Sequence, residues 1–266
     1  MPSVHSPRRV IWVCMLNVLC VFQAAHAELP HEISACGDQN EFPPFTYLAR
    51  EGGRITDRLT GYSVDYLRTL MAASGREAKI TLLPWARCLA LAAKGEIDIA
   101  LDGVRTPTRE RDFVFPSPYA SMRFGYIYAK SRPAPKVNVP TDLLGLSLCG
   151  QTGYTYEMFG LPPAMTINHA NSYNAAVRML FAGRCDLLFT NREVSSLYDE
   201  LGYENLLGSG KIEFAPLPWA QAIKFYLLVG RASPRRDELL EFLNREIERM
   251  DRSGETRKLT RQYLAK

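Results

Sequence analysis

One arginine in the middle of the chain lies in a local sequence suited to binding an anion. A short β-rich run over Ile97–Leu101 breaks at Asp102-Gly103, and Thr106-Pro107 then begins a turn that carries Arg109. Ligand crevices of open α/β sheets lie outside the carboxyl ends of the strands, and a guanidinium there can hold a carboxylate in two hydrogen bonds. The alternative is an exposed Arg109 that pairs loosely with a neighbouring carboxylate.

Two proline-bearing loops supply further candidates. Pro43 and Pro44 fix the backbone beside Phe42, so this aromatic ring loses little entropy when it contacts a ligand. Glu41, next to it, either meets a cation or is solvated. Trp85 follows Pro84 at the start of a predicted helix, and it either reaches a cleft or packs in the core.

Composition indicates a folded protein of ordinary surface charge. The chain has 266 residues, enough for one large domain or two small ones. Its formal net charge is +4, spread evenly, and no Lys/Arg-rich block with interleaved aromatic residues is present. We therefore expect no nucleic-acid partner.

The amino terminus has the features of an export signal. Arg8-Arg9 is a basic start, Val10–Phe22 is an apolar run too short to span a bilayer, and Ala25-His26-Ala27 fits the cleavage pattern. We predict a cleaved signal peptide over residues 1–27 and a periplasmic location. The mature chain would have a net charge of about +2 once the two arginines are removed. A retained membrane anchor is the alternative.

Four cysteines remain in the predicted mature chain. An even number in an exported protein predicts two disulfides, for which Cys36, Cys88, Cys149 and Cys185 allow three pairings. No Cys-x-x-Cys or Cys/His spacing is present, so we expect neither a metal nor a cofactor. No Ser-His-Asp or Cys-His set is apparent, which leaves no catalytic residue to propose.

The predicted elements alternate between strand and helix. Lys79–Leu83, Trp85–Lys94 and Ile97–Leu101 form a β-α-β unit, which implies parallel pairing. Ala93–Asp102 and Ala182–Asn191 share one order: helix end, glycine, apolar residues around an aspartate, then a strand. This internal echo predicts two α/β lobes of similar build. Farther along, we expect the loop Gly150–Thr155 to open a helix.

With these segments in place, the chain resembles the family 3 periplasmic solute-binding proteins, extracellular receptors for polar amino acids that serve ABC importers. The resemblance covers nearly all of the mature chain. It rests on the order and spacing of short segments, which are Phe42–Tyr47, Gly61–Asp65, Lys94–Asp98, Thr106–Arg109, Phe113–Ser117, Leu144-Gly145, Gly183–Asp186 and the carboxyl-terminal helices that contain Gly254.

The resemblance implies an α/β fold, the two-lobed periplasmic binding protein fold of type II. Each lobe would be a mixed, mostly parallel sheet flanked by helices, and two hinge strands would join the lobes. Lobe 1 would take residues 28–121 and 220–266, and lobe 2 residues 122–219. Because a disulfide between lobes would fix the hinge, this division implies the pairs Cys36–Cys88 and Cys149–Cys185.

The resemblance also implies a ligand site. Arg109 matches the arginine that binds the ligand α-carboxylate, and Phe42 matches the stacking aromatic. Tyr154 and Thr155 lie in the loop that meets the carboxylate from lobe 2, at a helix amino terminus. The carboxylate that pairs with the α-ammonium in the family falls at Asn191, which is neutral. Asp102 either takes over that role from the other lobe or caps its own turn.

The implied function is a monomeric receptor that is not an enzyme. It would capture a small polar solute, an amino acid or related carboxylate, by hinge closure and deliver it to an inner-membrane ABC permease. One alternative is an enzyme on the same fold, similar to the cyclohexadienyl dehydratases, with Asp102 or Glu41 as the acid. A second alternative is a ligand-sensing accessory protein that acts through a separate partner.

Overall fold

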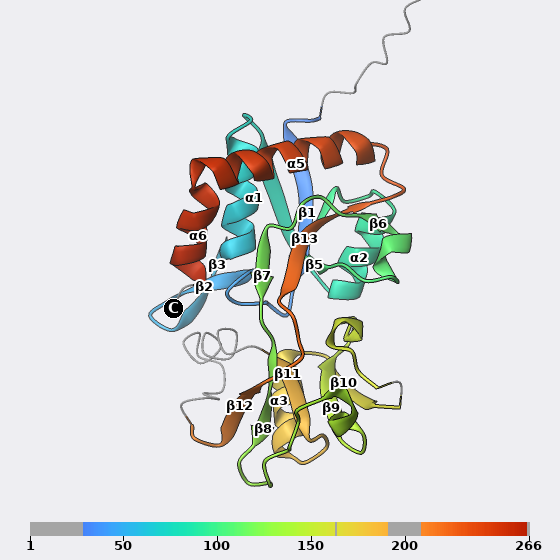
Figure 1. Cartoon of the computed structure of the whole chain (residues 1–266). Helices are drawn as coiled ribbons and strands as arrows, with labels where there is room; N and C mark the ends of the chain where they lie inside the picture. Colours follow the sequence, from blue (N-terminus) through green and yellow to red (C-terminus); the bar gives the residue numbers. More distant parts are fainter. Residues whose placement is uncertain (1–28, 163, 191–208, 265–266) are drawn as a thin grey trace, which may run out of the picture.

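The structure, a computed structural model, describes residues 29–162, 164–190 and 209–264. They form two lobes, each built on its own sheet (Figure 1). The sheet of the larger lobe runs β4 (Glu77–Leu83), β1 (Glu32–Asp38), β5 (Ile99–Val104), β13 (Ile223–Gly230) and β6 (Phe113–Val114), with β7 (Ala120–Met122) also paired to β13. The sheet of the smaller lobe runs β10 (Thr166–Ala170), β9 (Ser147–Gln151), β11 (Leu187–Thr190), β8 (Gly125–Ala129) and β12 (Ile212–Pro216).

Both sheets are mixed, and helices cover them. In the larger lobe β1 pairs in parallel with β4 and β5, whereas β13 is antiparallel to its neighbours. The helices of this lobe are α1 (Tyr62–Ala72), α2 (Trp85–Ala93), α5 (Arg236–Ser253) and α6 (Glu255–Tyr263), and a hairpin of β2 (Tyr47–Glu51) and β3 (Arg54–Thr60) extends from it. In the smaller lobe α3 (Tyr173–Phe181) packs on β9, β10 and β11. Three 3₁₀ turns lie at Arg109–Arg111, Pro140–Leu143 and Glu157–Phe159.

Two segments connect the lobes. The chain leaves the larger lobe between β7 and β8 and returns between β12 and β13 (Figure 1). On the larger-lobe side these segments are paired to one another, since Ser121 of β7 lies opposite Lys224 of β13. The arrangement is the two-lobed α/β fold with two connecting strands that the resemblance implied.

Strand β5 runs farther than its sequence predicts. The expected break at Asp102-Gly103 is wrong, because β13, more than a hundred residues away in sequence, pairs with Gly103 and Val104. The pairing register shifts at this point, and Asp102 adopts a left-handed conformation with φ of 57°. Gly103 is required here, since a Cβ atom would lie 2.3 Å from Leu228. The irregularity leaves Asp102 half-buried between two buried neighbours.

The aromatic loop before β2 is fixed against the first helix. The backbone N–H groups of Tyr62 and Ser63 donate to the carbonyls of Pro44 and Phe45 at 2.8 and 3.0 Å. Gly61 makes this approach possible, because a Cβ atom there would lie 2.2 Å from the Phe45 carbonyl oxygen. The rings of Phe42 and Phe45 stack with centroids 5.2 Å apart. Phe42 is therefore held by the start of α1 as well as by the prolines.

The internal echo corresponds to the same junction in each lobe. Asp98 accepts hydrogen bonds from the backbone N–H (3.0 Å) and hydroxyl (2.7 Å) of Ser34, and Asp186 accepts the same pair from Ser147 at 2.8 and 3.0 Å. Each aspartate also pairs with an arginine, Arg235 and Arg132 respectively. Both carboxylates therefore tie neighbouring parallel strands together, which is a structural role.

Each disulfide lies within one lobe. Cys36 of β1 is bonded to Cys88 of α2, and Cys149 of β9 to Cys185 just before β11. These are the pairs that the resemblance implied.

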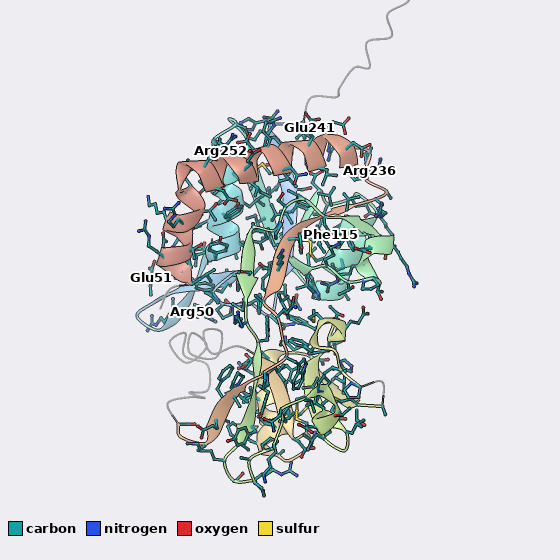
Figure 2. The ribbon with its side chains drawn as sticks, in the orientation of Figure 1. Arg50, Glu51, Phe115, Arg236, Glu241 and Arg252 are labelled. Atoms are coloured by element: carbon teal, nitrogen blue, oxygen red, sulfur yellow. A yellow bond between two sulfur atoms is a disulfide. The ribbon has the colours of Figure 1, made fainter. Side chains whose placement is uncertain are left out.

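On the outer side of the larger lobe, helix α5 carries charged side chains such as Arg236, Glu241 and Arg252 into solvent, far from the smaller lobe (Figure 2). No helix within the described ranges is both long and apolar enough to cross a membrane.

Replacing both cysteines of the smaller lobe, as Cys149→Ala with Cys185→Ala, should lower the free energy of unfolding by about 2–4 kcal/mol, because the bridge restricts the unfolded chain. Urea unfolding under non-reducing conditions measures the loss. A reducing agent added to the variant should then affect only the Cys36–Cys88 bridge. An unchanged unfolding midpoint in the variant would mean that Cys149 and Cys185 are not bonded in solution.

Candidate functional site

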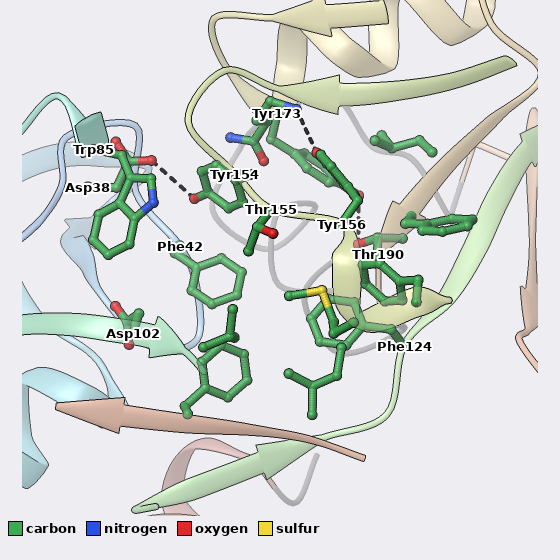
Figure 3. A pocket seen from close by; sticks show the side chains of 18 of the residues that line it. Asp38, Phe42, Trp85, Asp102, Phe124, Tyr154, Thr155, Tyr156, Tyr173 and Thr190 are labelled. Atoms are coloured by element: carbon green, nitrogen blue, oxygen red, sulfur yellow. Dashed lines mark hydrogen bonds between the residues drawn. The ribbon is translucent and has the colours of Figure 1, made fainter. Parts of the chain in front are cut away.

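A cavity between the two lobes brings together most of the predicted site residues. The larger lobe contributes Phe42, Trp85 and Asp102, and the smaller lobe contributes Tyr154 and Thr155 (Figure 3). Arg109 of the larger lobe also lines the cavity. The cavity volume is about 90 Å³, whereas one water molecule needs roughly 10–15 Å³ of such space. The cavity therefore has room for several waters or a compact solute.

Arg109 supplies an unpaired cation to this cavity. The Thr106 hydroxyl accepts from its backbone N–H at 3.2 Å, and one guanidinium nitrogen donates to the Val104 carbonyl at 3.1 Å. The guanidinium lies 5.6 Å from the centroid of the Trp85 ring. Burial lowers the pKa of Arg109 to about 10, so the group remains charged at neutral pH. Within the described ranges no carboxylate reaches ion-pair distance of it, which leaves this cation ready for an anionic ligand.

Asp102 supplies a carboxylate held by hydroxyl groups. Its Oδ2 atom accepts from the Thr46 hydroxyl at 2.6 Å, and its Oδ1 atom accepts from Tyr119 at 2.9 Å and from Ser63. Desolvation raises the pKa of Asp102, while these hydroxyl donors act in the opposite direction. No cation of the described chain pairs with this carboxylate, so its environment favours a cation supplied by a ligand.

Asp38 is a site residue that the sequence analysis did not select. It ends β1, and its Oδ2 atom accepts a hydrogen bond of 3.1 Å from the Tyr154 hydroxyl of the smaller lobe (Figure 3). Desolvation raises the pKa of this carboxyl as well. Asp38 lies at the carboxyl end of a parallel strand, where the ligand crevices of α/β sheets are found, and this position could have marked it as a site residue in the sequence. A second bond between lobes joins Thr108 to Glu157 at 2.9 Å.

The remaining walls of the cavity are mainly aromatic. Phe225 of β13 lies beside Phe42, with ring centroids 5.9 Å apart. From the smaller lobe the sequence analysis did not select the aromatic lining, which consists of Phe124, Tyr156, Phe159, Tyr173 and Phe189. These rings come from separate elements of the smaller lobe, and a ring in such a position normally belongs to a core, so no local signal marked them as cavity walls.

Three expectations need correction or fall outside the described residues. Glu41 does not line the cavity and is not solvated: it is 6% exposed and binds Arg50 of the hairpin at 2.8 Å. Gly150–Thr155 does not open a helix. Only a 3₁₀ turn follows it, and the Tyr154 N–H already donates to the Gln151 carbonyl at 3.2 Å. Asn191 lies outside the described residues.

The site holds no apparent metal centre. Over the part of the chain that the structure describes, no three His, Cys, Asp or Glu side chains gather closely enough to bind a metal ion. The charged groups of the cavity are instead one guanidinium and two carboxylates, set among aromatic rings. That combination suits a small organic zwitterion, bound through hydrogen bonds and ring contacts.

Comparison with known proteins agrees with this architecture. Residues 35–266 match the model of the bacterial extracellular solute-binding proteins, family 3. No match was found among curated protein sequences. Among solved structures, the substrate-binding protein of an amino acid ABC transporter is 19% identical with a TM-score of 0.71, over 88% of this chain and 100% of the other.

Two further solved structures are similar over most of their length. The arginine-, lysine-, histidine-binding protein ArtJ from Geobacillus stearothermophilus is 18% identical with a TM-score of 0.70, covering 88% of this chain and 96% of that protein. The ancestral amino acid-binding protein AncCDT-1, a precursor of cyclohexadienyl dehydratase, is 20% identical with a TM-score of 0.68, covering 88% and 95%. Identities this low establish a shared fold.

Substituting Tyr154→Phe removes the hydroxyl that bonds Asp38 across the lobes. We expect the ratio of open to closed molecules to rise about fivefold without ligand, as the loss of about 1 kcal/mol implies. Small-angle X-ray scattering should report a larger radius of gyration. Tyr128→Phe, on a half-buried tyrosine of β8 that does not line the cavity, is the matched control. Equal scattering from all three proteins would show that this bond does not hold the lobes together.

Proposed function

The chain belongs to the bacterial extracellular solute-binding proteins of family 3, and we propose from that premise that it is a periplasmic receptor for an amino-acid-like solute. It captures the solute between its lobes and delivers it to an inner-membrane ABC permease. The observation that carries the proposal is the pair of opposite, separately held charges in one cavity, Arg109 and Asp102. An α-carboxylate and an α-ammonium complement them.

Desolvation favours a zwitterionic ligand. Burial takes water away from Arg109 and Asp102, and the neutral groups that hold them do not neutralise either charge. A zwitterionic ligand restores a partner to both groups at once, and each hydrogen bond to a charged group contributes roughly 1.5–3 kcal/mol. The neutral residue at position 191 leaves the ammonium without the carboxylate usual in the family, and Asp102 replaces it from the larger lobe.

Capture proceeds by closure of one lobe on the other. The two connecting segments let the lobes rotate, and each disulfide lies within one lobe, so neither bridge opposes the motion. The bonds of Tyr154 to Asp38 and of Thr108 to Glu157 belong to the closed form. A cleaved signal peptide over residues 1–27 exports the chain, which acts as a monomer with the permease as its partner.

One observation favours a second function, an enzyme on the same fold. The raised pKa of Asp102, in a cavity with aromatic walls, suits a carboxylic acid that protonates a leaving group. Mass spectrometry of each ligand after incubation with the protein separates the two. A receptor gains thermal stability from the ligand by mass action and returns the ligand unchanged, whereas an enzyme converts it.

The Arg109→Gln variant should lose at least about tenfold in affinity for any carboxylate ligand, because a charge-assisted bond is removed from a desolvated site. Isothermal titration calorimetry with the ligand found by thermal-shift screening measures the loss. Arg111→Gln, on an exposed arginine of the same turn that does not line the cavity, should bind normally. Normal affinity in the Arg109 variant would remove the proposed carboxylate site.

Affinity for an ammonium-bearing ligand should depend on the ionisation of Asp102. The carboxylate must be deprotonated to bind the ammonium, and its pKa is raised in the empty protein. Affinity is therefore highest at pH values above that pKa and falls as the pH drops through it. At pH values near and below the pKa, ligand binding releases a proton from Asp102. Titration calorimetry from pH 7 down to pH 4, in buffers of different ionisation enthalpy, detects both effects.

The variant Asp102→Asn tests the same group at constant pH. Asparagine tolerates the left-handed conformation of this position, so the backbone is preserved. We expect a loss of about tenfold or more for an α-amino acid and a much smaller loss for the acid that lacks its amino group. Asp57→Asn, on exposed strand β3, is the control. Equal losses for both ligands would show that Asp102 does not bind the ammonium.

A further inference from the structure

The charges found in the cavity lie on one side. Among the described residues the formally charged lining side chains are Asp38, Asp102 and Arg109, and all three come from the larger lobe. Among the lining residues described in the smaller lobe none carries a formal charge, and most are aromatic or aliphatic. They include Phe124, Tyr156, Met158, Phe159, Leu188 and Phe189.

The hydroxyl groups of Tyr156 and Tyr173 in this wall are already engaged. The Tyr156 hydroxyl oxygen accepts from the backbone N–H of Gln151 at 2.7 Å, and the Tyr173 hydroxyl donates to Thr190 at 3.1 Å (Figure 3). Burial raises the pKa of Tyr156 to about 12, so its hydroxyl stays neutral. Both tyrosines therefore offer mainly ring carbon to the cavity.

Edge-to-face contacts fix the wall in place. The Phe159 ring lies 4.8 Å from Phe189 and 5.4 Å from Phe124, in both cases at a steep angle. The Trp219 indole donates to the Phe159 carbonyl at 3.0 Å, which anchors the turn that carries Met158. A wall made in this way is preformed and apolar, and it does not rely on a ligand to order it.

Asp38 is the one charged group left over once the ligand head is bound, and in the closed form it is engaged too. Its Oδ1 atom accepts from the Asn40 N–H at 3.0 Å and its Oδ2 atom from Tyr154 at 3.1 Å. A ligand side chain that faces the smaller lobe therefore meets mainly ring carbon, apart from the neutral Gln151 and Thr155. A charged group there would lose water without meeting an opposite charge among the described residues of that lobe.

We infer that the solute is an amino acid with an aromatic or large aliphatic side chain, whose head group lies on Arg109 and Asp102 and whose side chain lies on the apolar wall. This inference rests on the proposed function, and it names the class of ligand within it. This class of ligand differs from the arginine, lysine and histidine that ArtJ binds. One methylene more or less in such a pocket changes affinity by roughly 10- to 200-fold.

Ligands that share one head group test the inference directly. Titration calorimetry with L-phenylalanine, L-leucine and L-methionine is compared with L-arginine, L-lysine, L-glutamate and L-glutamine. We expect the best apolar ligand to bind at least about tenfold more tightly than every polar one. Circular dichroism and the melting temperature of the ligand-free protein show that each variant below is folded.

A matched pair of variants locates the contact. Met158→Gln places an amide in the wall at nearly constant volume, and it should weaken the best apolar ligand by about tenfold or more. Met179→Gln makes the same change at a half-buried methionine of α3 that does not line the cavity, and it should leave affinity unchanged. Equal affinities in the two variants would overturn the assigned contact.

The outcomes separate this inference from the proposed function. If a charged or amide amino acid binds most tightly and Arg109→Gln abolishes that binding, the receptor function stands and the apolar preference is wrong. If 3-phenylpropionate binds as tightly as L-phenylalanine, the wall is supported while the role of Asp102 is wrong. If no amino acid or related acid binds, the proposed function and this inference fall together.

Discussion

The candidate site depends on two opposite charges that are shielded from bulk water and held apart in the cavity between the lobes. Arg109 and Asp102 have no ionic partner in the described chain, yet each is held by several neutral groups, a carbonyl and an indole ring for one and three hydroxyls for the other. Neutral dipoles fix the position of a charge without cancelling it. Bringing the two together would give a salt bridge that competes with a ligand, so their separation is what leaves the cavity able to bind.

The fold achieves that separation through strand ends and one irregular strand. Asp38 ends β1, while Asp102 lies at the point where β5 changes register against β13 and carries a left-handed backbone. Such a conformation is uncommon for a residue with a side chain, and it persists only where surrounding contacts determine it. Here those contacts are the hydroxyl groups of Thr46, Ser63 and Tyr119. The same contacts that aim the carboxylate also stabilise the backbone that carries it.

Local sequence patterns predicted the features of the structure that are determined by contacts between residues close in sequence. The Thr-Pro turn predicted where Arg109 would lie, the prolines predicted a fixed Phe42, and the repeated aspartate junction predicted lobes of similar build. These patterns did not predict features that depend on contacts with segments far away in the sequence. The extension of β5 requires β13, the burial of Glu41 requires Arg50 of the hairpin, and the bond of Asp38 to Tyr154 requires the second lobe. The aromatic wall was missed because its rings are scattered over loops, a 3₁₀ turn, α3 and β11, and a ring in each of these places has the same sequence pattern whether it faces a core or a cavity.

The proposed closure and ligand selectivity both follow from the different lining residues that the two lobes contribute to the cavity. In the proposed receptor the larger lobe holds the charges, so a ligand head can be bound before the lobes meet. The described part of the smaller lobe adds mainly aromatic carbon, and its polar lining residues, such as Gln151, Tyr154 and Thr155, are neutral. Under the proposed closure, burying a ligand side chain against that carbon gives free energy only in the closed form, whereas the ionic contacts exist in the open form as well. A ligand shifts the equilibrium by its differential affinity for the two states. The apolar wall, rather than the charge pair, is therefore the element that couples the identity of the side chain to closure.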